Sequence, residues 1–243
     1  MGRTSGARLA VDIGGTFTDV VLEMRGGKRF TTKLLTTYGH PGDAVLEGIA
    51  TVLGEASIEP SAVDLIIHGT TLATNALIER SGAVTALLTT EGHRDALEMA
   101  HEDRFEQYDV MINRPTPLVP RHLRLPVRER LDAGGKVLVP LDQSSLDTCL
   151  PVLDEHGVES VAIGYLHAFV NPEHEQRTAE WLCSKRPGLS ITLASEVCPE
   201  IREFERLSTA CANAYVRPLM SSYLERLAGE LEQRGLDCPF LLM

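Results

Sequence analysis

The chain begins with hydrophobic positions that alternate in the manner of β-strands. "RLAVDI" predicts a buried strand, "TDVVLEM" a second and "FTTKLLTT" a third, with a glycine-rich turn before the second and the turn "RGGKR" before the third. Strands joined by such short turns run antiparallel to each other. The first 37 residues therefore predict a three-stranded meander.

The hydrophobic spacing then changes to that of a helix. "HPGDAVLEGIATVLGEA" predicts a helix with Asp43 as its N-cap, and "VDLIIHGTT" predicts a short buried parallel strand. "LATNALIERSG" predicts a second helix that ends at Gly82, and "AVTALLTT" a further buried strand. The resulting order, β-β-β-α-β-α-β, predicts an α/β fold.

Neither period continues from Glu91 to about Pro126, where the sequence is polar, aromatic and rich in proline. We expect an irregular functional or packing segment there. "RERLDAGGKVLVPLD" then predicts a hairpin with its turn at Gly134 and Gly135.

Alternation of helices and strands resumes after this hairpin. "SSLDTCLPVLDEHG" predicts a helix, "VESVAIGYLHAF" a strand, "NPEHEQRTAEWLCSK" a helix capped by Asn171 and "LSITLASE" a strand. A long helix follows and ends at Gly235. The final "LDCPFLLM" has the pattern of a new strand, so we expect the sequence to be the front part of a longer protein.

Composition narrows the class of protein. The formal net charge of -11 argues against a nucleic-acid surface, which requires a basic patch. No run approaches the roughly 20 apolar residues of a membrane helix. The five cysteines are scattered without a CxxC pair, as expected for reduced thiols in a cytoplasmic protein.

The first candidate site is the turn between the first two strands, Asp12 to Thr18. Glycines at 14 and 15 bring backbone N–H groups close to a ligand, and Thr16 and Thr18 carry hydroxyls suited to phosphate oxygens. Asp12, at the end of a strand, suits Mg²⁺, held through water. The alternative is a plain polar hairpin. This is neither a P-loop nor a dinucleotide GxGxxG.

The second candidate site, His68 to Thr71 with Asn75, follows a predicted parallel strand. Ligands gather at the carboxyl ends of such strands, and Asn75 lies one turn into the next helix. Two structural alternatives stay open. His68 is also consistent with a satisfied core histidine, and Thr70 or Thr71 with a helix cap.

The third candidate site is a stripe on the long helix. Glu205, Thr209 and Asn213 recur every four residues and therefore share one helix face. Such a stripe either lines a cleft or is solvated.

Five blocks of the chain together resemble the hydantoinase A / 5-oxoprolinase family. They are "VDIGGTFTDVV", "IIHGTTLATNALIERSGAVTALLTTEGHRDALEMA", "LVPRHLRLPVRERLDAGGKVLVPLD", "FVNPEHEQRTAEWL" and "SEVCPEIREFERLSTACANAYVRPLMSSYLERL". The resemblance implies an actin/hexokinase-like (ASKHA, ribonuclease H-like) fold with an inserted or adjoining α/β region. It also implies three regions: a phosphate-binding subdomain at 6–90, the α/β region at 91–200, and the start of the hydantoinase A core at 201–243.

The resemblance further implies ATP-dependent hydrolysis of a cyclic amide, of the hydantoin or 5-oxoproline type, through phosphorylation of the carbonyl oxygen. ATP and Mg²⁺ would be required, and a hydantoinase B-type subunit is an expected partner. The family also contains subunits of acetone-type carboxylases, which is one alternative. A truncated, non-catalytic fragment is another, because the second phosphate loop and the adenosine pocket of such a fold do not occur before Met243.

The residues that match the family motifs receive the following expected roles. We expect catalysis from Asp12, His68, Thr70 and Glu205, nucleotide binding from Asp12, Gly14, Gly15, Thr16, Thr18, Thr71 and Asn75, and Mg²⁺ binding from Asp12.

Overall fold

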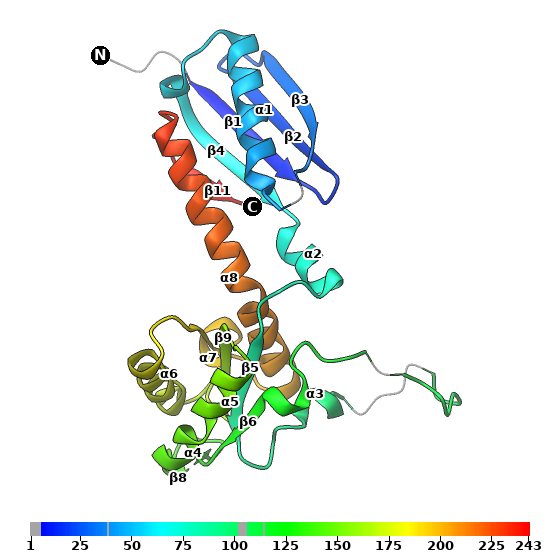
Figure 1. Ribbon diagram of the computed structural model, residues 1–243, viewed down its shortest axis with the longest axis vertical. Coiled ribbons are helices and arrows are strands. Elements are labelled where there is room, and N and C mark those ends of the chain that lie inside the picture. The colour runs from blue at the N-terminus through cyan, green and yellow to red at the C-terminus, as the bar shows by residue number, and fades with distance from the viewer. Residues whose placement is uncertain (1–5, 38, 102–105, 114) are drawn as a thin grey trace. The chain divides into compact units, whose positions relative to one another are not determined.

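The computed structural model describes residues 6–37, 39–101, 106–113 and 115–243. These residues form two compact units, which are distinguished in Figure 1 by their separate sheets. Unit 1 comprises the described residues up to Glu79 together with Leu219–Met243, and unit 2 comprises Arg80–Pro218. The units differ from the three expected regions because the last part of the chain returns to unit 1. The limits implied by the family resemblance remain a prediction.

Unit 1 is built on a five-stranded sheet with the order β11-β4-β1-β2-β3. Its elements are β1 (Ala7–Ile13), β2 (Phe17–Met24), β3 (Arg29–Leu35), α1 (Pro41–Ala56), a 3-10 turn (Pro60–Ala62), β4 (Val63–Thr70), α2 (Leu72–Glu79) and β11 (Phe240–Leu242), joined by the second half of α8 (Glu203–Gln233). β1, β2 and β3 are antiparallel, whereas β4 is parallel to β1 and β11 to β4. The predicted meander and the predicted final strand are confirmed.

Alternation along β1 separates a buried face from an exposed one. Leu9, Val11 and Ile13 are buried in a cluster with side chains of α1 and of the end of α8, such as Ile49 and Leu227. In Figure 1, α1 crosses the meander, and the red end of α8 lies along β4 and β11. Because successive strand residues point to opposite faces, Asp12 lies on the exposed face.

Two expected helix boundaries in unit 1 are wrong. Helix α1 begins at Pro41 with His40 in the N-cap position, and Asp43, the expected cap, forms an ion pair with Arg226 at 2.9 Å. Helix α2 ends at Glu79, three residues before Gly82.

Unit 2 is built on a four-stranded parallel sheet with the order β10-β9-β5-β6. Its elements are β5 (Thr85–Thr90), α3 (Ala96–Met99), a 3-10 turn (Arg121–Leu123), β6 (Arg124–Val127), β7 (Arg130–Leu131), β8 (Val137–Val139), α4 (Gln143–Asp147), α5 (Cys149–Glu155), β9 (Ser160–Gly164), α6 (Glu173–Lys185), β10 (Ser190–Leu193), α7 (Ala194–Val197) and the first half of α8. β5 and β9 are buried throughout, as predicted for fully buried parallel strands.

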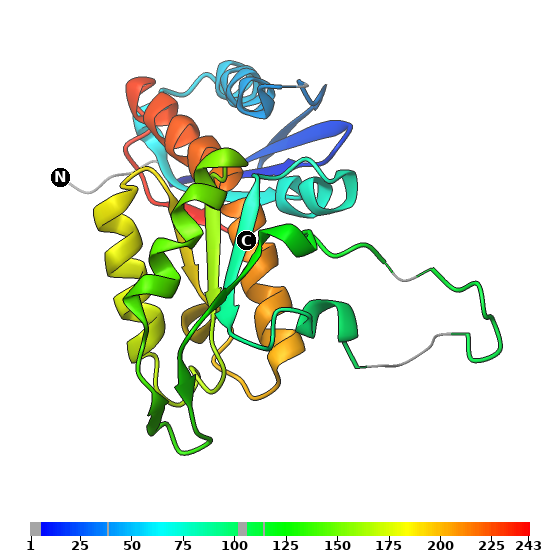
Figure 2. The same cartoon turned by 60° about the horizontal axis from the view of Figure 1, so that its bottom comes forward.

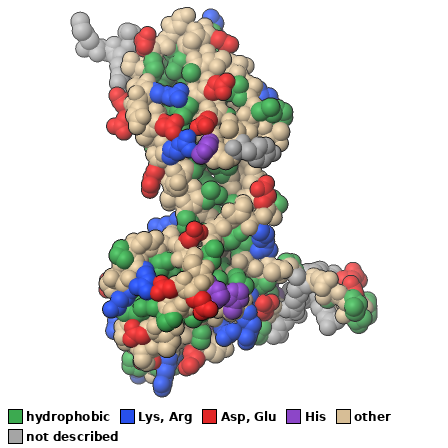
Figure 3. All heavy atoms as spheres, in the orientation of Figure 1, with side chains coloured by type: hydrophobic (Ala, Val, Ile, Leu, Met, Phe, Trp, Pro, Cys, Tyr) green, Lys and Arg blue, Asp and Glu red, His purple; other side chains and the backbone are tan. Residues whose placement is uncertain are grey.

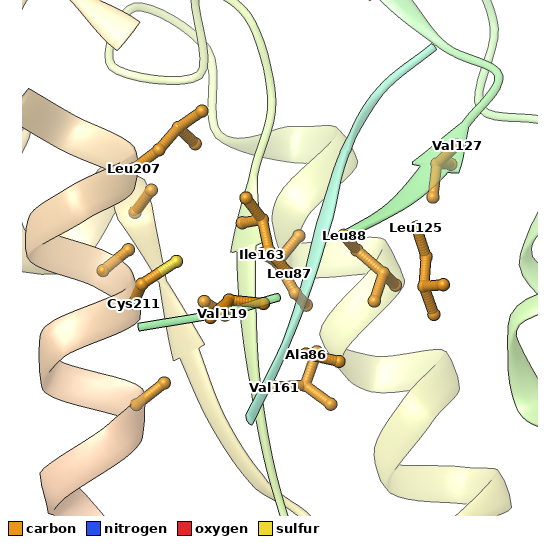
Figure 4. Packing of buried hydrophobic residues seen from close by; sticks show 14 of the residues in the cluster. Ala86, Leu87, Leu88, Val119, Leu125, Val127, Val161, Ile163, Leu207 and Cys211 are labelled. Carbon is orange, nitrogen blue, oxygen red and sulfur yellow. The ribbon is translucent and has the colours of Figure 1, made fainter. Parts of the chain in front are cut away.

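Helices cover both faces of this sheet. Figure 2 shows α5 and α6, in light green and yellow, on one face and the orange part of α8 on the other. In Figure 4, Leu207 and Cys211 of α8 approach the strands from the side opposite to that of Leu125 and Val127. These side chains belong to one hydrophobic cluster that also contains Leu153 of α5.

Five sequence-based expectations for unit 2 need correction. Two are strands shorter than expected: β9 ends at Gly164, and β10 ends at Leu193, where helix α7 begins. The segment expected to be irregular as far as Pro126 contains strand β6, which pairs with β5 from Arg124 onward. The single helix expected in "SSLDTCLPVLDEHG" is two helices, α4 and α5. Helix α6 begins at Glu173, with Pro172 rather than Asn171 in the N-cap position, although Asn171 Oδ1 accepts a hydrogen bond from the Glu173 N–H at 3.1 Å.

The predicted hairpin at Gly134 and Gly135 is confirmed as the antiparallel pair β7 and β8. All five cysteines are free thiols. Within the described ranges, no helix combines the length and the apolar character needed to cross a membrane. On the face shown in Figure 3, basic and acidic side chains are interspersed rather than gathered in a basic patch.

Candidate functional site

The parallel pairing of β1 with β4 brings the two N-terminal candidate blocks together. Asp12 is in register with Gly69, and Ile13 with Thr70. Immediately beyond β4, the Thr71 N–H and hydroxyl both donate to the Ile13 carbonyl oxygen, at 3.0 and 3.3 Å. The glycine turn after β1 and the polar loop after β4 therefore share one edge of the sheet.

Asp12 is an exposed carboxylate at this edge. A Cβ atom on Gly69 would lie 3.0 Å from Asp12 Oδ1, so glycine leaves space beside the carboxylate. Its cross-strand neighbour Asp19 is paired with Lys33 at 3.0 Å. Among the described residues, Asp12 has no such partner, which leaves its oxygens available to a cation.

The turn itself presents backbone donors. The Gly14 N–H donates to the Phe17 carbonyl oxygen at 2.9 Å, which closes the hairpin. The N–H groups of Gly15 and Thr16, both exposed, have no backbone acceptor within the part of the chain that the structure describes. A Cβ on Gly15 would lie 3.2 Å from Asn75 Nδ2, so the Asn75 amide lies directly beside the turn.

The Thr18 side chain is buried, so it is not presented at the sheet edge for the expected contact with phosphate. Its hydroxyl is 3.0 Å from that of Thr36, which donates to the Gly14 carbonyl oxygen at 3.0 Å. The Thr36 N–H also donates to the Thr16 carbonyl oxygen. Both threonines therefore hold the turn in shape. Thr36 was missed from the sequence, although the meander places it at the same sheet edge.

The polar loop after β4 begins helix α2. Thr70, the last residue of β4, accepts a hydrogen bond at Oγ1 from the Leu72 N–H at 3.2 Å, which forms a local turn. The N-cap position belongs to Thr71, whose carbonyl oxygen accepts from the Asn75 N–H at 2.8 Å. Asn75 Nδ2 donates to Thr71 Oγ1 at 3.3 Å. Thr71 thus links the β1 carbonyl to Asn75, and the Asn75 amide faces the glycine turn.

His68 is buried in the core of unit 1 instead of facing the sheet edge. Its Nε2 is 2.8 Å from the Tyr223 hydroxyl, and its ring stacks on Phe240 with the centroids 5.6 Å apart. Desolvation lowers the pKa of His68, an effect that the nearby Asp12 charge partly opposes. These contacts are those of the core histidine that was the structural alternative, and the expected catalytic role has no support in them.

We expect His68 to make unit 1 less stable at acid pH. Its pKa in the folded state lies below the unfolded value of 6.5, so the unfolded chain takes up the proton first as the pH falls. Relative to His68→Gln, the wild type should lose up to about 1.4 kcal/mol of unfolding free energy per pH unit below 6.5. Urea unfolding between pH 5.0 and 7.5, followed by circular dichroism, measures this difference. Equal pH slopes for the two proteins would contradict it.

Glu205, the remaining expected catalytic residue, belongs to unit 2. Its Oε1 lies 3.3 Å from Arg202 Nη1 and 3.6 Å from His101 Nε2, and it lines a cavity of about 640 Å³. Along the same helix, Asn213 Oδ1 accepts a hydrogen bond from Thr192 at 3.0 Å, and Thr209 is exposed. The three residues of the expected stripe therefore have different surroundings: Glu205 lines a cavity, Thr209 is exposed to solvent and Asn213 contacts β10.

The edge of unit 1 has the donors and the carboxylate that a magnesium–phosphate group requires. Mg²⁺ takes one or two carboxylates and completes its shell with water and phosphate oxygens. The described residues contain no cluster of three or more metal-ligating side chains, so Asp12 is an isolated exposed carboxylate at this edge. Free N–H groups at a glycine turn suit phosphate oxygens.

This mixed α/β chain belongs to the hydantoinase/oxoprolinase family, whose N-terminal region matches residues 8–185. It is 37% identical over 238 residues to the caprolactamase subunit alpha of Pseudomonas jessenii, covering 96% of this chain and 34% of that one. It is 32% identical over 251 residues to the acetophenone carboxylase gamma subunit of Aromatoleum aromaticum, again covering 96% and 34%.

The fold agrees with a solved relative. The crystal structure of the ATP-dependent caprolactamase from Pseudomonas jessenii matches with a TM-score of 0.88 at 35% identity, over 97% of this chain and 35% of that one. The chain thus spans about a third of the length of these relatives.

Proposed function

We propose that unit 1 has the actin/hexokinase-like fold and binds the β- and γ-phosphates of ATP with Mg²⁺. The observation that carries this is the convergence at one sheet edge of free N–H groups at Gly15 and Thr16, the unpaired Asp12 carboxylate and the Asn75 amide. The antiparallel meander followed by the parallel strands β4 and β11 supports the fold assignment.

The reaction we propose is ATP-dependent opening of a cyclic amide. Transfer of the γ-phosphoryl group breaks the bond to ADP and forms a bond to the amide carbonyl oxygen. The adjacent carbon becomes electrophilic and water adds to it. The carbon–nitrogen bond then breaks, which opens the ring to an amine and an acyl phosphate, and a second water hydrolyses the acyl phosphate to a carboxylate and free phosphate. Asp12 orients the cation or the attacking group, the turn positions the phosphates, and the Asn75 amide lies beside the turn, so the protein contributes positioning and charge stabilisation.

We also propose that the protein works with a second subunit of the hydantoinase B type. The related proteins named as an alpha subunit and a gamma subunit support this. The similarity to a carboxylase subunit favours one other function, phosphorylation of a ketone enol or of bicarbonate before carboxylation.

Phosphate release from ATP in the presence of different substrates separates the two functions. The protein, with its partner subunit where one is found, is incubated with Mg·ATP and 5-oxoproline, a hydantoin, a larger lactam or a ketone with bicarbonate. The proposal expects release that depends on a cyclic amide. Release that depends only on a ketone and bicarbonate would assign the carboxylase function instead.

A further inference from the structure

Unit 2 contains a cavity at the carboxyl edge of its parallel sheet. The cavity of about 640 Å³ is lined by residues that follow three strands: Gly92 and His93 after β5, Arg130 after β6, and His167 after β9. In the sheet order β10-β9-β5-β6, the chain leaves β5 toward β6 but leaves β9 toward β10. The connections therefore diverge between β5 and β9, the topological switch point at which open α/β sheets bind ligands.

The backbone is strained around this cavity. Five non-glycine residues have positive φ in the described ranges, and three of them, Ala100, His167 and Arg202, line it. Non-glycine residues adopt this conformation at a cost, and they concentrate at functional sites. His167 has a φ of 60° and lies in the loop after the central strand β9. Its Nδ1 is buried without a hydrogen-bond partner among the described residues.

Within the described chain, the ion pairs around the cavity leave one arginine of its lining without a carboxylate partner. Each acidic side chain in the wall already has an arginine partner: Asp95 with Arg121 at 2.8 Å, Glu203 with Arg206 at 3.6 Å and Glu205 with Arg202 at 3.3 Å.

Arg130, by contrast, has no carboxylate partner in the described part of the chain. Its Nη1 lies 2.8 Å from His93 Nε2. His93 Nε2 accepts this hydrogen bond and His101 faces Glu205, so the groups left to an anion are the remaining N–H donors of Arg130 and the ring of His167.

An apolar cavity adjoins the polar one. It has a volume of about 470 Å³ and shares Ala100, His101 and Phe204 with its neighbour. The rest of its lining is largely apolar and includes Leu97, Leu118 and Cys211. A ligand whose anionic end lies near Arg130 can therefore extend an apolar chain past Phe204.

We propose that unit 2 is a second ligand-binding unit, whose cavity binds a small organic carboxylate between Arg130 and His167 with its hydrocarbon chain in the apolar cavity. This site lies within unit 2 alone and does not depend on the nucleotide site proposed for unit 1. A ring-opened amide ends in such a carboxylate, so the product class of the proposed reaction matches the chemistry of the cavity.

Binding is measured on the 243-residue chain by NMR of the histidine ring signals at fixed pH, with acetate, pentanoate and inorganic phosphate as probes. We expect pentanoate to shift a subset of the eight histidines saturably. Burial of a methylene contributes up to about fourfold in affinity, so pentanoate should bind at least about tenfold more tightly than acetate. Phosphate should bind more weakly than pentanoate.

Arg130→Gln should weaken pentanoate binding at least tenfold, and His167→Asn should weaken it measurably because asparagine tolerates positive φ but lacks the ring. Arg128→Gln, an exposed arginine outside the cavity lining, is the matched control and should bind normally. Trp181 fluorescence verifies that each variant folds. The absence of saturable shifts, equal losses in Arg128→Gln and Arg130→Gln, or phosphate binding as tightly as pentanoate would overturn the proposal.

Discussion

Substitution of Asp12 by asparagine is expected to reduce ATP turnover about 100-fold or more without loss of folding. The side chain is exposed and without an ion-pair partner among the described residues, so asparagine fits the same space beside Gly69. The substitution removes the negative charge that the proposed Mg²⁺ or attacking group requires. Removal of one preorganised electrostatic contact typically lowers turnover by about 100-fold or more. Steady-state phosphate release, in the form of the protein that turns over ATP, measures the effect.

Asp64→Asn is the matched control. Asp64 is an exposed carboxylate on the same strand as Gly69 but near its opposite end, so the variant loses the same charge far from the glycine turn. It should keep normal turnover. Near-normal turnover in Asp12→Asn would remove Asp12 from the mechanism, and an equal loss in both variants would assign the effect to net charge.

Gly82→Ala is expected to destabilise unit 2 by about 3 kcal/mol. A Cβ at this position would lie 2.3 Å from two ring carbons of Tyr215 and 2.6 Å from its carbonyl oxygen. The same carbonyl accepts a hydrogen bond from the Ala83 N–H at 2.9 Å, so the backbone is held close and a change of side-chain rotamer cannot relieve the contact.

The single tryptophan, Trp181 in α6, lies in unit 2 and reports its unfolding in urea. Gly188→Ala serves as the control, because a Cβ there would meet no atom within 4 Å. The control should unfold at nearly the wild-type urea concentration. A Gly82→Ala midpoint equal to that of the control would mean that the α8 backbone moves away at little cost.

Local pattern in the sequence was sufficient for the meander and the buried parallel strands. The pairing of β1 with β4, which brings the Asp12 turn to the loop around Thr71, is known from the structure. Alternation predicts which face of β1 is buried, and the carboxyl ends of adjacent parallel strands must share an edge. The sequence-based prediction of residue roles failed where the role depends on contacts with residues far away in the sequence. From the sequence, Gly82 was expected to end a helix. In the structure, glycine is required there because the backbone passes close to Tyr215, which is far away in the sequence.

The roles of individual side chains were the least predictable. His68 has the sequence context of a site residue, but Tyr223 and Phe240 bury it, and both arrive from the far end of the sequence. Strand β6 was not predicted because it contains Pro126, and proline usually argues against a strand. β6 is an edge strand of its sheet, where the missing N–H of proline is tolerated. The cavity of unit 2 depends on loops after three separate strands and has no contiguous motif.

The discontinuity of unit 1 has a consequence for synthesis on the ribosome. Strand β11 pairs with β4 only after the whole of unit 2 has been translated, whereas unit 2 is a single continuous segment. Unit 2 can therefore complete its own sheet first. Once folded, it replaces a long flexible loop by a compact body, which lowers the entropy lost when the edge strand closes the sheet of unit 1. A defect confined to unit 2, such as Gly82→Ala, should therefore also delay completion of the unit 1 sheet and of the proposed nucleotide site at its edge in the nascent chain.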